Sequence, residues 1–63
     1  MEHRLIEIKG EVLFEEYLHS LGVTPRHLDQ EQEIYLQDRH LAAIRRVKGE
    51  LRFFLHAAEL THA

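Results

Sequence analysis

The 63-residue chain has no cysteine and no tryptophan, and it contains only one proline and three glycines. Without cysteine, disulfides and thiolate metal sites are excluded. A single domain of this length buries only about 60% of the surface that its unfolded chain exposes, so its core is marginal. Small domains usually compensate with a disulfide, a metal or a second subunit. We therefore expect oligomerisation to supply the missing stability.

Long hydrophobic runs are also missing. No apolar stretch approaches the 18 or so residues of a membrane span. The first residues, MEHRLIEIKGEV, mix charged with apolar side chains, whereas a signal peptide needs an unbroken apolar region. We expect a cytoplasmic protein that does not contact membranes.

Groups suited to covalent catalysis are scarce. The chain has a single serine, Ser20, no cysteine and no glycine-rich loop that could hold a phosphate. Its carboxylates include Glu7, Glu11 and Glu15, whose i, i+4 spacing is typical of a solvated or salt-bridged helix edge rather than of a general acid and base. We expect no catalytic residues, no cofactor and no enzymatic activity.

Histidine is abundant enough in this chain to suggest a metal site. The six histidines are His3, His19, His27, His40, His56 and His62. No two have the i, i+3 or i, i+4 spacing that places two ligands on one helical face, so the sequence predicts no metal-binding residues. His40 is interpreted as a core-edge or interface histidine, and a pH-sensitive contact is the alternative.

Residues 41–60, LAAIRRVKGELRFFLHAAEL, carry the strongest periodic signal in the chain. Their apolar side chains recur at spacings of three and four, which predicts one stripe on a helix about 30 Å long. The stripe, which we expect to be the dimer or partner interface, comprises Ile44, Val47, Leu51, Phe54, Leu55 and Ala58. Thr24 and Pro25 suit a helix start. We expect one long helix over about residues 25–60, bent at Gly49.

A shorter helix is predicted over about residues 3–21. Its apolar stripe comprises Leu13, Phe14, Tyr17, Leu18 and Leu21. Gly22 is well placed to end it. Residues 4–9 are ambiguous, because Ile6 and Ile8 alternate with charged residues as in a strand. Helix is preferred there, since a lone two-stranded ribbon is only marginally stable in water.

These two helices predict an all-α fold, a helical hairpin forming a single domain over residues 1–63. The second helix is longer than the first, so residues 47–60 would expose an apolar patch that monomers rarely tolerate. Dimerisation into a four-helix bundle would cover this patch, and a two-fold dimer is the commonest oligomer. A protein partner of another kind would meet the same need.

Charge is unevenly spread along the chain. The formal net charge is −3, yet the segment from Gln37 to His56 has five cations and two anions. Within it, Arg45, Lys48 and Arg52 would share one helical face that could follow phosphates. Alternatively, this basic face pairs in the dimer with the row of Glu7 and its neighbours. The net negative charge favours the second interpretation.

Together these features predict a small non-enzymatic regulatory or accessory protein that acts through protein–protein interaction as a helical homodimer. Chains this short are frequent among bacterial and phage proteins that modulate larger machines, and we expect an accessory protein of that kind. The alternative is a nucleic-acid-binding regulator that uses the basic helix face of the dimer. No residue indicates the identity of the partner.

Overall fold

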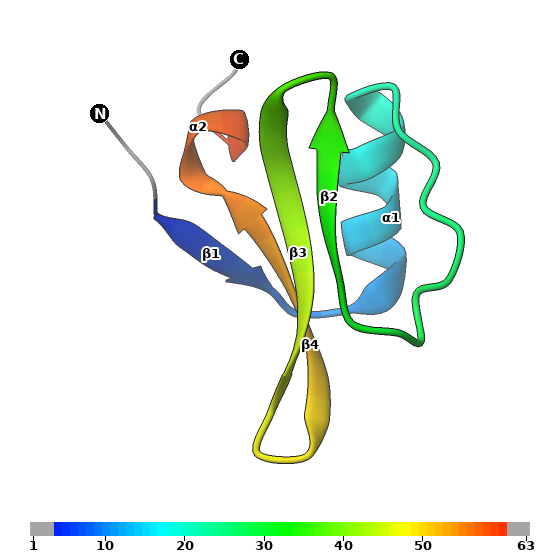
Figure 1. Ribbon diagram of the computed structural model, residues 1–63, viewed down its shortest axis with the longest axis vertical. Coiled ribbons are helices and arrows are strands. Elements are labelled where there is room, and N and C mark those ends of the chain that lie inside the picture. Colours follow the sequence, from blue (N-terminus) through cyan, green and yellow to red (C-terminus); the bar gives the residue numbers. More distant parts are fainter. Residues whose placement is uncertain (1–3, 61–63) are drawn as a thin grey trace.

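The computed structural model describes residues 4–60 and shows a mainly β protein. Its elements, in chain order, are β1 (Leu5–Ile8), α1 (Glu11–Ser20), β2 (Gln32–Leu36), β3 (Arg39–Val47), β4 (Glu50–His56) and α2 (Ala57–Leu60) (Figure 1). The strands form one antiparallel sheet in the order β1-β4-β3-β2. The expected all-α helical hairpin and four-helix bundle are therefore wrong.

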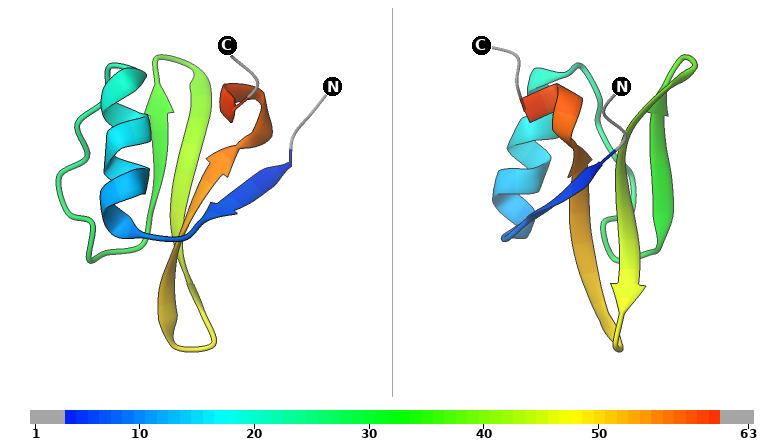
Figure 2. Two further views of the ribbon diagram at one scale, coloured as in Figure 1. Left: turned by 180° about the vertical axis from the view of Figure 1, so that it is seen from behind. Right: turned by 90° about the vertical axis from the view of Figure 1, so that its left-hand side faces the viewer.

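The sheet has one covered face and one open face. Helix α1 packs against one face, and the right-hand view of Figure 2 shows no other element of residues 4–60 on the opposite face. The β3–β4 hairpin extends beyond the first turn of α1 (Figure 1). Antiparallel sheets commonly keep one face in water. No second chain is needed to cover an overhanging helix, so that argument for a dimer lapses.

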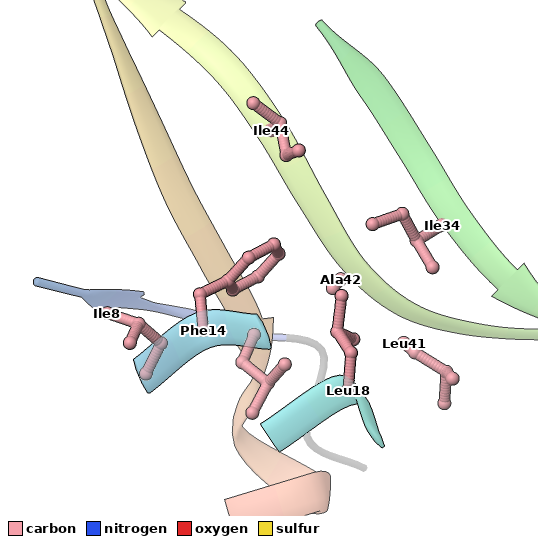
Figure 3. Close-up of a cluster of buried hydrophobic side chains, with 8 residues drawn as sticks. Ile8, Phe14, Leu18, Ile34, Leu41, Ala42 and Ile44 are labelled. Atoms are coloured by element: carbon pink, nitrogen blue, oxygen red, sulfur yellow. The ribbon is translucent and has the colours of Figure 1, made fainter. Parts of the chain in front are cut away.

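The core lies between α1 and the sheet. Phe14 and Leu18 project from α1 with no solvent exposure and meet side chains from all four strands (Figure 3). The strand residues of this cluster are Ile8, Ile34, Leu41, Ala42, Ile44 and Leu55. The ring of Phe14 also lies 5.0 Å from that of Phe53. Each large side chain buried in this way contributes about 1.5–3 kcal/mol.

The period of two in β4 explains why the helical stripe was misleading. Leu51, Phe53 and Leu55 are fully or partly buried against the core cluster, so the alternating residues between them face the other side of the sheet. Ile44 and Leu55 are therefore core residues of their own chain, with no exposure. In a strand, residues three apart lie on opposite faces and only residues four apart share one, so a stripe of mixed spacings combines both faces.

The other members of the expected interface are dispersed. Val47 and Phe54 lie on the open face, Leu51 packs at the edge of the core, and Ala58 is exposed in α2. The six positions consequently share no single surface.

The turn between β3 and β4 consists of Lys48 and Gly49. Both have positive φ, 52° and 83°, and they connect the opposed residues Val47 and Glu50. Two consecutive positive φ angles match the two-residue hairpin turn whose twist suits the adjoining strands. The expected bend at Gly49 within a helix is thus a complete chain reversal.

Gly49→Ala should therefore destabilise the protein by about 1 kcal/mol, because an L side chain at φ of 83° is strained. In a continuous helix, the same change would stabilise by about as much. Urea unfolding followed by circular dichroism gives the sign. A more stable variant would contradict the hairpin.

Residues 4–9 were also predicted wrongly. β1 pairs with β4 along its whole length, from Leu5 opposite His56 to Ile8 opposite Phe53. The alternation of Ile6 and Ile8 was the correct signal, because β1 is the fourth strand of a sheet rather than half of a lone ribbon. Helix α1 lies within the expected span of 3–21 but begins only at Glu11, and residue 3 lies outside the described residues.

Membrane insertion by a helix has no support in this part of the chain. Within residues 4–60, neither helix is long and apolar enough to cross a bilayer.

Candidate functional site

The open face of the sheet gathers the polar and aromatic side chains of all four strands. Directly opposed residues of neighbouring antiparallel strands share a face. In this register one row crosses the sheet as Glu33, Ala43, Phe54 and Glu7. Arg45 lies opposite Arg52 in the next row, toward the β3–β4 turn. On the same face but away from that turn, Tyr35 lies opposite His40, and Leu5 lies opposite His56.

A β-bulge brings His40 onto this face. Ile34 pairs with Ala42, whereas the next residue, Tyr35, pairs with His40, so Leu41 is an extra residue in β3. Leu41 and Ala42 are both fully buried in the core cluster. Bulges often change the direction of a side chain in this way. The ring of His40 consequently lies against that of Tyr35, with centroids 4.9 Å apart.

His40 lies between a second imidazole and a carboxylate. Its Nδ1 is 2.9 Å from Nε2 of His56, a hydrogen bond in which one nitrogen donates and the other accepts. Its Nε2 is 2.9 Å from Oε1 of Glu33, a close contact that lacks the alignment of a hydrogen bond. Glu33, His40 and His56 thus form one polar chain, although the two histidines are 16 positions apart in the sequence.

Arg45 fixes the position of Glu33. Its Nε and Nη2 donate to the two carboxylate oxygens at 3.0 and 2.9 Å. This hydrogen bonding from Arg45, together with the charges of Arg45 and His40, lowers the pKa of Glu33 against the opposing effect of burial. The same pair raises the pKa of Arg45. Two parallel bonds from one guanidinium make this the best-defined ion pair of the face.

The pair makes acid stability depend on Glu33. A carboxyl whose pKa is lower in the folded state contributes stability that is present above its unfolded pKa and lost as pH falls through its folded pKa. We expect Glu33→Gln to lower the free energy of unfolding by up to about 1 kcal/mol at pH 7, since the pair is partly exposed. The deficit should shrink as the pH falls below the ordinary glutamate pKa of about 4.3 and disappear below the lowered pKa of the folded state. Urea unfolding at pH 7, 5 and 3 measures this. Glu16→Gln on α1 is the control, and parallel pH curves would contradict the assignment.

The expected basic trio does not form a free surface. Arg52 contacts Glu7 at 3.3 Å and Glu50 at 3.4 Å, so each of the two opposed arginines has its own carboxylate. Lys48 lies apart from them in the β3–β4 turn and forms no ion pair with any of residues 4–60. The expected pairing of Glu7 with a cation does occur, but within one chain. Glu11 and Glu15 lie on α1 and, within residues 4–60, form no ion pair with these cations.

A shallow pocket of about 670 Å³ opens beside the two histidines. It is lined by Leu5, Asp38, Arg39, His40, Arg45, His56, Ala58 and Glu59. The side chain of Glu59 is only 4% exposed, and its Oε2 lies 3.6 Å from Nε of Arg39. No three metal-ligating side chains of residues 4–60 form a complete metal site. The pocket therefore offers imidazole nitrogens, a carboxylate and a small apolar wall.

Sequence reasoning treated the histidines singly and missed their proximity. A turn at Lys48 and Gly49 sets the register of β3 and β4 and would have placed residue 41 opposite His56. The bulge at Leu41 then brings His40 near that position, and no local pattern predicts a bulge there. His3 and His62 lie outside the described residues.

The chain matches no protein-family model, no curated protein and no solved structure. Its function therefore has to be argued from its own surfaces.

Proposed function

We propose that this protein is a small non-enzymatic accessory protein that acts by binding another protein along the outer edge of β2. The observation that carries the proposal is the exposure of two large apolar side chains on this edge strand. Tyr35 is 57% exposed and Leu36 is 38% exposed. Aromatic side chains are enriched where proteins bind one another.

The backbone of β2 supports the same surface. β2 is the last strand of the sheet, so among residues 4–60 no strand pairs with its outer side. A groove of about 370 Å³ runs between this strand and the loop that precedes it, with Val23 and Pro25 on the loop side. An extended segment of a partner can add to such an edge through main-chain hydrogen bonds, while pockets beside it select side chains. The other edge strand, β1, has only four residues and ends next to Lys9.

A non-enzymatic role fits the polar groups. Ser20, the only serine, lies at the end of α1, where its hydroxyl donates to the backbone oxygen of Tyr17 at 2.7 Å. A nucleophile needs a neighbouring base that takes its proton, whereas the Ser20 hydroxyl donates to a backbone oxygen. The arginines that could stabilise a developing negative charge, Arg45 and Arg52, are already paired with carboxylates.

Changing Tyr35 and Leu36 together to lysine should abolish protein capture and leave the fold intact, because both side chains face solvent. The test is affinity capture from a nuclease-treated lysate of the source cells. Val12→Lys with Leu13→Lys is the matched control, since these apolar residues are 68% and 46% exposed on α1. Capture lost equally in both variants, or unaffected by the β2 change, would contradict the proposal.

A second copy of the chain is one protein that could occupy this edge, and we propose a homodimer on that basis. Sedimentation equilibrium at micromolar concentration should then give twice the 7.5 kDa chain mass, and the mass of one chain in the β2 variant. A wild-type protein at 7.5 kDa would leave the edge to another partner and exclude the dimer.

Nucleic-acid binding remains the alternative because of one observation. Phe54 and Tyr35 lie on an open sheet face that also carries Arg45 and Arg52, and single-stranded nucleic acids stack on aromatic and guanidinium groups. Against it, both arginines are paired and the net charge is −3. We expect labelled RNA and DNA to bind weakly at physiological salt. Tight binding with a steep salt dependence, lost when Arg45, Lys48 and Arg52 become glutamine, would replace the protein-binding proposal.

A further inference from the structure

The geometry points to a divalent transition-metal ion bound between Nδ1 of His40 and Nε2 of His56, with Cu²⁺ as the preferred ion. Both rings line the pocket at the α2 end of the open face. No metal site was predicted from the sequence, because the histidine spacings were compared only with those of a helix. In the sheet, β3 and β4 bring the two imidazoles together across 16 positions.

The distances between the two rings match two ligands of one ion. Imidazole nitrogens bind such ions at about 2.0–2.1 Å. At the angle of roughly 90° found in tetragonal copper and nickel sites, two such nitrogens lie about 2.9 Å apart, with ring centres about 4.5 Å apart. The observed values are 2.9 Å between the nitrogens and 4.7 Å between the centroids.

The hydrogen bond between the two imidazole nitrogens is bent. A straight N–H···N bond of 2.9 Å would place the ring centres about 5.2 Å apart. The observed separation of 4.7 Å is shorter, so the two rings meet at an angle rather than in line. In a metal complex the ion would take the place of the proton that the two nitrogens share, at a point beside the rings.

Glu33 supplies the second feature of a metal-binding histidine. A histidine ligand almost always presents its other ring nitrogen to a carboxylate or carbonyl, which fixes the ring and makes the coordinating nitrogen more basic. Oε1 of Glu33 lies 2.9 Å from Nε2 of His40, an ion-pair contact rather than an aligned hydrogen bond, and Arg45 holds that carboxylate with two hydrogen bonds. Glu33 is thus a positioning residue for His40.

The pocket accommodates the remaining ligands of the ion. Only two protein nitrogens are available among residues 4–60, where no three-residue metal cluster occurs, so water or a small ligand would complete the coordination. The carboxylates of Asp38 and Glu59 line the same pocket and offset the charge of Arg39. Among divalent ions, imidazole sites of this kind favour Cu²⁺.

The test is titration of the full-length protein with Cu²⁺, followed by calorimetry and electron paramagnetic resonance. All samples carry His3→Gln and His62→Gln, so that the histidines near the chain ends do not compete for the metal. We expect one Cu²⁺ per chain and a spectrum showing two imidazole nitrogens. His40→Gln and His56→Gln should each weaken binding at least about tenfold, and Glu33→Gln should weaken it about tenfold, the usual effect of removing an outer-shell carboxylate.

The double variant His19→Gln with His27→Gln is the matched control and should bind Cu²⁺ unchanged, since both residues are exposed elsewhere on the protein. Circular dichroism without metal checks that each variant is folded. If a variant at His40 or His56 unfolds, the proposal is tested by the number of coordinating imidazole nitrogens in the spectrum of the folded parent protein. Absence of stoichiometric binding, a spectrum with fewer than two imidazole nitrogens, or equal loss in the control would overturn the proposal.

Discussion

Phe14→Ala is expected to lower the free energy of unfolding by about 3–5 kcal/mol. Phe14 has no solvent exposure, lies at the centre of the core cluster and contacts Phe53 across the helix–sheet interface. A domain of 63 residues has a total stability of only about 3–9 kcal/mol. The variant should therefore lose a large share of its stability, as measured by urea and thermal unfolding.

Leu13 provides the control for this prediction. It precedes Phe14 on α1 and is 46% exposed, so Leu13→Ala should cost less than about 1 kcal/mol. Similar losses for the two variants would mean that α1 packs with a different face on the sheet.

Ile44→Asp should prevent folding, whereas Val47→Asp should leave a folded protein. Ile44 has no exposure and faces α1, so its replacement buries an unpaired charge at a cost of several kcal/mol. Val47 lies on the open face at the end of β3, opposite Glu50, where the added charge costs about 1 kcal/mol or less. Circular dichroism and thermal unfolding of the two variants measure the difference.

This pair also separates the two folds. Three residues apart, Ile44 and Val47 would share one face of a helix and tolerate aspartate to the same degree. Equal disruption, or equal tolerance, would contradict the alternation of faces in β3.

The sequence contained the local signals of the N-terminal half. Phe14 and Leu18 were both on the expected apolar stripe, and they are the two residues that α1 buries. The alternation in residues 5–8 was also visible. What no local pattern reveals is the partner of β1, because Ile6 pairs with Leu55, far along the chain. Without that partner, the segment could only be judged as a weak isolated ribbon.

The second half was misread because two periodicities coincide there. Ile44 and Leu55 fall on the same helical stripe as Val47 and Phe54, although the strands place these pairs on opposite faces. The turn at Lys48 and Gly49 also lacks the asparagine or aspartate that usually precedes glycine in a two-residue hairpin.

The polar chain on the open face was even less accessible to sequence reasoning. It depends on the pairing of β3 with β4 and on the bulge at Leu41. Both are tertiary features that override local propensity. Once the register is known, however, the proximity of His40 and His56 follows from it.

The most direct test of this account is a nuclear Overhauser spectrum of the isotopically labelled protein at neutral pH. The sheet predicts contacts between the ring protons of His40 and His56, together with cross-strand backbone contacts between Arg45 and Arg52. Extended backbone shifts should accompany them through β3 and β4. A continuous series of contacts between residues three apart over residues 41–60, with no contact between the two histidine rings, would contradict it.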